Sequence, residues 1–163
     1  MMITRLNHAV LYVRDARVHQ RFYADLLDFE TVAEDAGGGY VFMRAPRSEN
    51  HHDIAFFTVG AGASDSTAGR GSVGMYHIGW EVATLADLEA VRGRLEACGA
   101  LVGESDHGGN LSIYSKDPDG LEFEVMWLVP RAAWGEAATE AIIRPLDLTA
   151  EMQRFGADRV GGG

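Results

Sequence analysis

Short β-rich runs and one helical stripe follow each other in the same order twice along the chain. Residues 6–13 form the first β-rich run, and the stretch 16–27 places apolar side chains at helical spacing. Residues 75–82 and 85–97 repeat this pair. Each predicted helix is followed by three further short β candidates, at 30–33, 40–44 and 53–59 in the first half and at 100–103, 111–116 and 121–128 in the second. Both halves therefore predict the order β-α-β-β-β.

Cap residues and a glycine-rich stretch set the boundaries of the two repeats. Asp15 and Thr84 stand where an N-cap would begin each predicted helix. The Gly-rich stretch 60–74 separates the repeats as a flexible linker. We therefore expect a single domain over residues 1–130, made of module one (4–59), the linker and module two (75–128).

Residues 131–163 belong to neither repeat and form a C-terminal extension. A helix is expected at 136–143, followed by a break at Pro145 and a second short amphipathic stretch that ends at Phe155. An extension of this kind usually packs over a sheet or against a second subunit.

The first predicted strand of each module carries a histidine in the same frame, His-x-x-x-x-Val. His8 begins this frame in module one and His77 begins it in module two, 69 residues later. Side chains alternate along a strand, so each histidine points away from the apolar residues that pack under the helices. On the last strand of module two, Glu122 and Glu124 share the face opposite Phe123. Two histidines and a carboxylate are therefore expected together.

Imidazole and carboxylate are ligands that suit Fe, Mn, Zn or Ni. Two histidines and one carboxylate on one side of a metal leave the opposite side open, and with Fe(II) this arrangement binds substrate and dioxygen together. A single histidine on a strand is more often hydrogen-bonded scaffolding. The repeated frame and the carboxylate on the terminal strand together favour a metal site, and strand parity leaves Glu122 and Glu124 as equal candidates.

These features resemble the vicinal oxygen chelate superfamily, which includes glyoxalase I, bleomycin-resistance proteins, methylmalonyl-CoA epimerase and the extradiol catechol dioxygenases. The likeness covers roughly residues 4–128, including the segment Asp-Pro-Asp-Gly-Leu-Glu-Phe-Glu at 117–124. It implies an α+β fold in which two tandem βαβββ modules form one curved mixed sheet around a metal-binding cup, with a C-terminal helical extension. The family places its carboxylate four residues after the glycine of this turn. The resemblance therefore implies the metal ligands His8, His77 and Glu124.

Within the superfamily, the chain resembles the single-domain extradiol dioxygenases. His52 precedes a strand, as the acid/base histidine of those enzymes does, and Tyr114 lies ten residues before Glu124, where they place a tyrosine that hydrogen-bonds the substrate. The resemblance implies an Fe(II)-dependent enzyme that opens the ring of a catechol-like vicinal diol with dioxygen, with Mn, Zn or Ni as other metals. His107 and Gly108 resemble a further active-site pair of some members, but their gap to Tyr114 is shorter.

Two other functions stay open at this level. A glyoxalase-like isomerase or lyase would use Zn, Ni or Mn to stabilise an enediolate. Glyoxalase I takes a fourth ligand from the last strand of its first module, and residues 53–59 have apolar side chains where that carboxylate would stand. A small-molecule-binding resistance protein with a vestigial site is the third reading, and it predicts no bound metal.

Charge and cysteine content narrow the partners and the location. Fourteen Lys and Arg against 24 Asp and Glu give a net charge of −10, which disfavours binding to nucleic acid or to an anionic membrane surface. No apolar run is long enough for a membrane span. Cys98, the one cysteine, excludes an internal disulfide and favours a cytoplasmic location. It is expected to be buried, and His19 is expected at the surface. Edge strands of such a sheet often pair across a homodimer.

Overall fold

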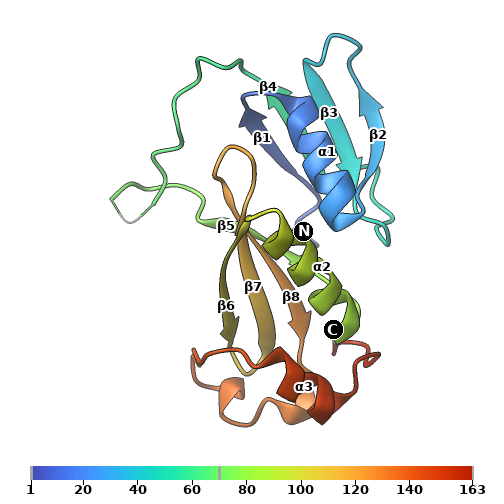
Figure 1. Cartoon of the computed structure of the whole chain (residues 1–163), viewed down its shortest axis with the longest axis vertical. Helices are drawn as coiled ribbons and strands as arrows, with labels where there is room; N and C mark the ends of the chain where they lie inside the picture. The colour runs from blue at the N-terminus through green and yellow to red at the C-terminus, as the bar shows by residue number, and fades with distance from the viewer. Residues whose placement is uncertain (1, 70, 163) are drawn as a thin grey trace. The chain divides into compact units, whose positions relative to one another are not determined.

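The computed structural model describes residues 2–69 and 71–162, so Arg70 of the predicted linker lies outside the described residues. Module one contains β1 (Ala9–Val13), α1 (Ala16–Leu27), β2 (Glu30–Glu34), β3 (Tyr40–Arg44) and β4 (Ile54–Thr58). Its sheet has the order β1-β4-β3-β2, in which β1 runs parallel to β4 and the other pairs are antiparallel. Helix α1 lies along one face of this sheet (Figure 1). The predicted order of module one is confirmed.

Helix α1 begins at the predicted cap, where the Asp15 side chain accepts a hydrogen bond of 2.8 Å from the backbone of Arg17. The buried stripe of α1 consists of Ala16, His19, Tyr23 and Leu27. The prediction that His19 lies at the surface is wrong, because its place between Ala16 and Tyr23 on the helix turns it toward the sheet. Its ring is 1% exposed and lies 5.1 Å from the ring of Phe56.

Module two repeats the same arrangement. It contains β5 (His77–Glu81), α2 (Leu85–Ala97), β6 (Leu101–Asp106), β7 (Asn110–Lys116) and β8 (Glu122–Leu128). The strand order is β5-β8-β7-β6, again with one parallel pair, β5 and β8. The strands thus pair as two four-stranded sheets, whereas the resemblance implied one curved sheet. In each module the first strand pairs with the last strand, so β1 and β5 are both edge strands of their own sheets.

Helix α2 begins with a reciprocal capping box between Thr84 and Asp87, with both hydrogen bonds at 3.1 Å. Its buried stripe is Leu85, Leu88, Val91 and Leu95. The prediction that Cys98 is buried is wrong, because Cys98 is the C-cap residue, where the chain leaves the helix beyond the last buried leucine. Its thiol donates to the Leu95 carbonyl oxygen at 3.3 Å and is otherwise exposed.

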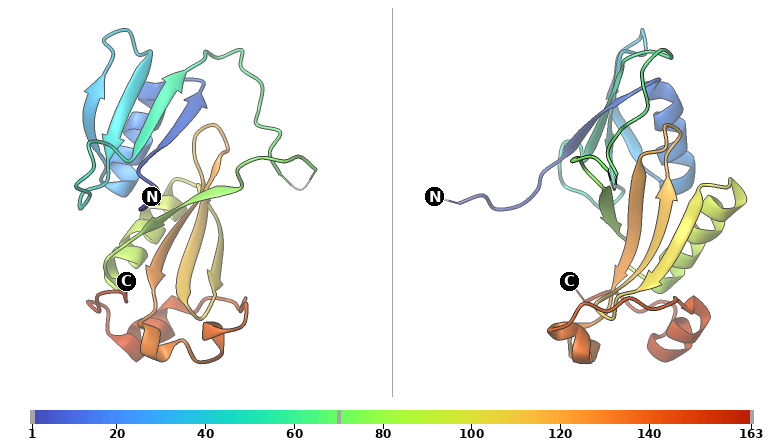
Figure 2. Two further views of the ribbon diagram at one scale, coloured as in Figure 1. Left: turned by 180° about the vertical axis from the view of Figure 1, so that it is seen from behind. Right: turned by 90° about the vertical axis from the view of Figure 1, so that its left-hand side faces the viewer.

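The C-terminal extension contains less helix than predicted. The helix expected at 136–143 is wrong: two 3₁₀ turns, Arg131–Ala133 and Gly135–Ala138, are followed by a non-helical segment up to α3 (Leu148–Phe155). Arg144 forms an antiparallel bridge with Asp106, and its extended backbone also suits a residue that precedes Pro145. Figure 2 shows the extension at one end of the second sheet. Helix α3 confirms the second predicted stretch.

Contacts divide the chain into two compact units. One comprises the residues up to Ser66 together with Pro118–Gly120, and the other comprises Thr67–Asp117 and Leu121–Gly163. The tip of the turn between β7 and β8 therefore belongs to the unit that contains module one. Within the described part of the chain, no helix combines the length and the apolar character that crossing a membrane requires.

Candidate metal centre

His77 and Glu124 meet on the sheet of module two. Their strands run parallel, and the register places Gly79 of β5 directly beside Glu124 of β8. The Nε2 atom of His77 lies 3.3 Å from Oε2 of Glu124, and the glutamate is only 5% exposed. A Cβ atom at Gly79 would stand 3.5 Å from the same carboxylate oxygen. That distance is an ordinary contact, whereas the same Cβ atom would lie 2.7 Å from the Met126 Cε atom, so the absence of a side chain at Gly79 leaves room for Met126 beside the carboxylate.

Two side chains of β7 hold the other oxygen of Glu124. The hydroxyl of Tyr114, which is directly opposite Glu124 in the register, donates to Oε1 at 3.1 Å. The Asn110 amide is a longer donor at 3.4 Å. Burial, followed by the negative charge of Glu124, raises the pKa of Tyr114 to about 12. The phenol therefore keeps its proton at neutral pH and acts as a hydrogen-bond donor.

His107 extends this network, although its sequence spacing departs from the family pattern. Its Nε2 atom lies 2.8 Å from the Tyr114 hydroxyl oxygen, and its Nδ1 atom lies 2.9 Å from the carbonyl oxygen of Ile142 in the extension. His107, Tyr114, Glu124 and His77 thus form a continuous polar chain within one compact unit. No pattern in the sequence indicated the contact with Ile142, because the two residues are 35 positions apart.

In module one, His8 and His52 lie next to each other. His8 directly precedes β1 and is exposed, and the centre of its ring is 4.5 Å from that of His52. Burial, followed by the charges of His8 and His51, lowers the pKa of His52 below its ordinary value of 6.5. His52 is therefore neutral at neutral pH, with a ring nitrogen able to accept a proton.

Asn50, which the sequence reasoning missed, ties the loop of His52 to the segment before β1. This residue is 8% exposed. Its amide nitrogen donates to the Asn7 backbone oxygen at 2.9 Å and to the Asp53 carboxylate at 2.7 Å. Its amide oxygen accepts from the Arg5 guanidinium at 2.5 Å. These bonds fix the neighbours of both histidines, and only the polar identity of Asn50 beside His51 could have hinted at them.

An aromatic surface covers the face of the first sheet that is opposite α1. The rings of Tyr40, Phe42 and Phe57 lie 5.3–5.9 Å from one another. Tyr12 lies at one end of this cluster, 6.5 Å from Phe57 and 77% exposed. The ring of His52 lies at the other end, 4.9 Å from Phe42. The aromatic surface therefore reaches the histidine pair.

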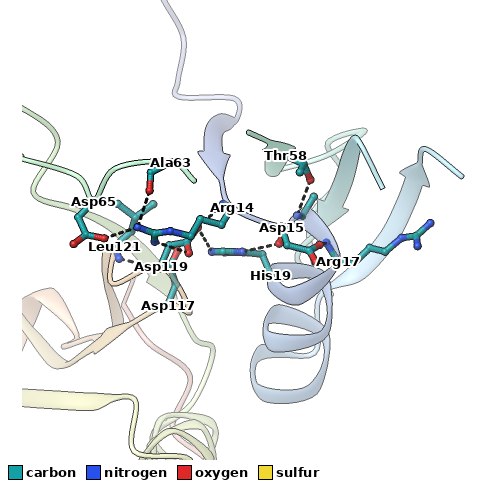
Figure 3. A network of polar contacts seen from close by, with 11 residues as sticks. Arg14, Asp15, Arg17, His19, Thr58, Ala63, Asp65, Asp117, Asp119 and Leu121 are labelled. Atoms are coloured by element: carbon teal, nitrogen blue, oxygen red, sulfur yellow. Dashed lines mark hydrogen bonds and ion pairs between the residues drawn. The ribbon is translucent and has the colours of Figure 1, made fainter. Parts of the chain in front are cut away.

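The turn that carries the family segment is held by ion pairs (Figure 3). Asp119 accepts hydrogen bonds from the backbone of Arg14 at 2.7 Å and from its guanidinium at 3.0 Å, and Arg14 also pairs with Asp65. Burial raises the pKa of Asp119, but the hydrogen bonds from Arg14 and the nearby charge of His19 outweigh it, so the pKa lies below its ordinary value. This part of the segment is structural.

The structure brings together some of the predicted site residues. His77, Glu124 and Tyr114 lie together in one compact unit, and His8 lies with His52 in the other. Among the residues described, no group of three or more His, Cys, Asp or Glu side chains is arranged as a metal site. The three-ligand set therefore stays a prediction.

The donor atoms of His77 and Glu124 nevertheless fit a divalent cation. The carboxylate is buried with one oxygen 3.3 Å from the Nε2 atom of His77, and the Nδ1 atom of His77 is buried without a hydrogen-bond partner in the described chain. Imidazole nitrogen next to carboxylate oxygen is a donor set for Fe, Mn, Zn or Ni. A cation would also neutralise a carboxylate that burial makes costly to keep charged.

Comparison with known proteins assigns this architecture to a class. The pattern of the Glyoxalase/Bleomycin resistance protein/Dioxygenase superfamily matches residues 5–125. The chain therefore belongs to that superfamily, as its fold and histidine frames predicted. No curated protein is similar enough to the chain to count as a match.

Solved structures share the fold at low sequence identity. A glyoxylase/bleomycin resistance protein/dioxygenase domain from Frankia sp. EAN1pec has a TM-score of 0.63 and 20% identity, with 77% of this chain and 92% of that chain covered. Lactoylglutathione lyase from Agrobacterium tumefaciens has a TM-score of 0.53 and 24% identity, with 73% of this chain and 90% of that chain covered. A third structure is the fosfomycin resistance protein FosX from Listeria monocytogenes, complexed with Mn(II) and 1S,2S-dihydroxypropylphosphonic acid. It has a TM-score of 0.57 and 23% identity, with 76% of this chain and 90% of that chain covered. These neighbours support the fold and do not single out the extradiol dioxygenases.

Proposed function

We propose that the chain is a metal-dependent extradiol dioxygenase that acts on a catechol-like vicinal diol. His8, His77 and Glu124 would hold Fe(II), which would supply a Lewis acid and electron transfer toward dioxygen. In the overall reaction, both atoms of dioxygen enter the substrate and the ring opens beside the diol.

The observation that carries this proposal is the pairing of each predicted proton-handling residue with a predicted ligand. His52 lies against His8, with ring centres 4.5 Å apart, and Tyr114 donates to Glu124 at 3.1 Å. A site that served only to polarise one substrate oxygen would need neither pair. A ring-cleaving enzyme needs a base for the first substrate hydroxyl and a donor for a developing oxygen anion.

The pKa values of these two residues suit the roles. His52 has a lowered pKa and is neutral at neutral pH, so it would take the proton of a substrate hydroxyl. Tyr114 has a raised pKa, so it would keep its proton and donate a hydrogen bond to a substrate oxygen.

The aromatic surface of module one supports an aromatic substrate. Ring faces and edges attract a planar ring, and each such contact contributes about 0.5–1.5 kcal/mol beyond its buried area. The exposed Tyr12 and the partly exposed Tyr40 leave part of this surface accessible. A substrate ring held there would lie against the same sheet as His52.

The test is anaerobic reconstitution with Fe(II), followed by dioxygen and a panel of catechols. Oxygen uptake with one equivalent of a semialdehyde product, which absorbs in the visible or near-ultraviolet, is the expected result. His52→Gln should lower kcat strongly, and His51→Gln, which keeps the His52 ring but removes its 3.0 Å contact with the neighbouring ring nitrogen, should lower kcat less. Absence of oxygen uptake by protein that retains Fe(II) would overturn the dioxygenase proposal. Enediolate chemistry with Mn, Zn or Ni would then indicate a glyoxalase-like isomerase or lyase, and protein that binds no metal would indicate a resistance-type binder.

A further inference from the structure

The extension is anchored to the end of the second sheet beside His107. The segment 134–144, here called the docking segment, exchanges two backbone hydrogen bonds of 2.9 Å between Arg144 and Asp106. At its other end, the Trp134 indole donates to the Val129 carbonyl oxygen at 2.7 Å. A Cβ atom on Gly108, which has a left-handed φ of 72°, would lie 2.6 Å from the Ala137 Cβ. The docking segment therefore approaches the turn next to His107 as closely as a glycine allows.

This anchoring determines where His107 carries its ring proton. The atom 2.9 Å from Nδ1 is the carbonyl oxygen of Ile142, which can only accept a hydrogen bond. Nδ1 must therefore be protonated, and in the neutral ring Nε2 is then an acceptor. The atom 2.8 Å from Nε2 is the hydroxyl oxygen of Tyr114, which can donate to it.

The hydroxyl of Tyr114 has one proton and two possible acceptors. His107 Nε2 lies at 2.8 Å and Glu124 Oε1 at 3.1 Å, so a neutral His107 competes with the carboxylate for the same proton. A proton directed to His107 leaves Oε1 with only the long contact from Asn110 at 3.4 Å. The tautomer of His107 therefore decides how strongly Glu124 is hydrogen-bonded within its own module.

We infer that the docking segment is part of the candidate site: the Ile142 carbonyl keeps the proton of His107 on Nδ1, and His107 is a positioning residue for the Tyr114 hydroxyl. The segment thereby gives the Tyr114 proton a second acceptor, His107 Nε2, beside the Glu124 oxygen. This inference goes beyond the proposed function, because it holds for any reaction at this site and its test needs neither metal nor substrate.

¹⁵N NMR of the histidine rings tests the inference on the full chain in mildly alkaline buffer, with His107→Gln used to assign the signals. The expected result is a protonated Nδ1 and an unprotonated Nε2. The Tyr114→Phe variant removes one of the two hydrogen-bond partners of the His107 ring and leaves the other, the Ile142 carbonyl oxygen. It should leave the proton on Nδ1 if Ile142 sets the tautomer. A shift of the proton to Nε2 in this variant would mean that Tyr114 sets it, and would overturn the inference.

A matched pair of variants tests the docking segment itself. Arg144→Pro removes the backbone N–H that donates to Asp106, whereas Arg144→Ala keeps it. We expect Arg144→Ala to retain the wild-type ring signals and Arg144→Pro to show a mixture of both tautomers. Wild-type signals in folded Arg144→Pro, or an Nε2-protonated ring in the wild type, would contradict the inference. If Arg144→Pro does not fold, the Tyr114→Phe spectrum still decides.

Discussion

The two residues expected to handle protons, His52 in module one and Tyr114 in module two, have pKa values displaced in opposite directions by the same first cause. Burial lowers the pKa of His52 and raises that of Tyr114 to about 12. In both cases the charged form is disfavoured. The next cause is in each case a neighbour predicted to be a metal ligand: the charge of His8 for His52, and that of Glu124 for Tyr114. Two chemically different groups are thus kept neutral at neutral pH.

The surroundings of the two pairs differ. Tyr114 lies in a chain of polar contacts that runs from Ile142 to His77, so its position is fixed by polar groups. His52 contacts mainly rings, those of His8, Phe42 and His51, and has one polar contact of 3.0 Å between its Nδ1 atom and that of His51. His77 is the first residue of β5 and His8 immediately precedes β1, and different groups surround the two histidines. Module two offers a preorganised polar site, and module one offers an aromatic surface beside a base.

The largest expected effect comes from a substitution that disturbs the polar contacts of module two, at the glycine next to His107. Gly108→Ala combines a left-handed φ of 72° with a Cβ 2.6 Å from Ala137, so we expect a loss of about 2–4 kcal/mol in the free energy of unfolding, measured by urea titration. Gly109→Ala is the control, because its Cβ would make only an ordinary contact of 3.8 Å with Trp134. Equal effects of the two substitutions would contradict the close docking of the extension.

Asp119→Asn tests the ion pair that holds the turn to module one. Charge-assisted hydrogen bonds from Arg14 are lost, and we expect a loss of about 1–2 kcal/mol at neutral pH. Because the folded-state pKa of Asp119 is lowered, its stabilisation is fully present above the unfolded-state pKa and is lost as the pH falls through the folded-state value. The unfolding energies of wild type and variant should therefore converge in acid. Asp65→Asn, at a carboxylate whose side chain is 88% exposed, should change little.

The pKa of the Tyr114 phenol tests how strongly the neighbouring carboxylate contributes, compared with burial. Glu124→Gln removes the second cause of its raised pKa and leaves burial, the first cause, in place. The pKa should fall but stay above the ordinary value of 10. Tyrosinate absorbance, assigned by subtraction of the Tyr114→Phe titration, measures it. An unchanged pKa in Glu124→Gln would show that the carboxylate does not act on the phenol.

The smallest expected effect concerns His52. His8→Gln should raise the pKa of His52 toward 6.5 without reaching it, because burial remains, and His51→Gln should raise it less. Proton NMR titration of the ring resolves both shifts. A larger shift in His51→Gln than in His8→Gln would reverse the order of neighbours on which the pairing with His8 depends.

Local patterns predicted most of the fold. Period-two and helical spacing identified the eight strands and the two long helices, and Asp15 and Thr84 marked the helix starts, because these signals act within a few residues. The errors at His19, Cys98 and 136–143 have another origin. His19 is a polar residue that its place on α1 buries, and Arg144 is held by a bridge to Asp106, 38 residues away in the sequence. Such contacts leave no periodic trace.

The candidate site was predicted in part for the same reason. The histidine frame and the family resemblance selected residues that the structure places in contact, namely His77 with Glu124 and His8 with His52. Asn50 and Ile142 were missed, because one acts through its side-chain amide and the other through a backbone carbonyl that any residue possesses.

Metal content measured after purification without chelators and reconstitution with Fe(II) tests the central claim most directly. We predict one metal per chain in the wild type and in Glu122→Ala, whose carboxylate shares the strand face of Glu124. Glu124→Ala and His77→Ala should lose most of the metal. Retention of one metal by Glu124→Ala, or its loss from Glu122→Ala alone, would contradict the assignment of His77 and Glu124 as ligands.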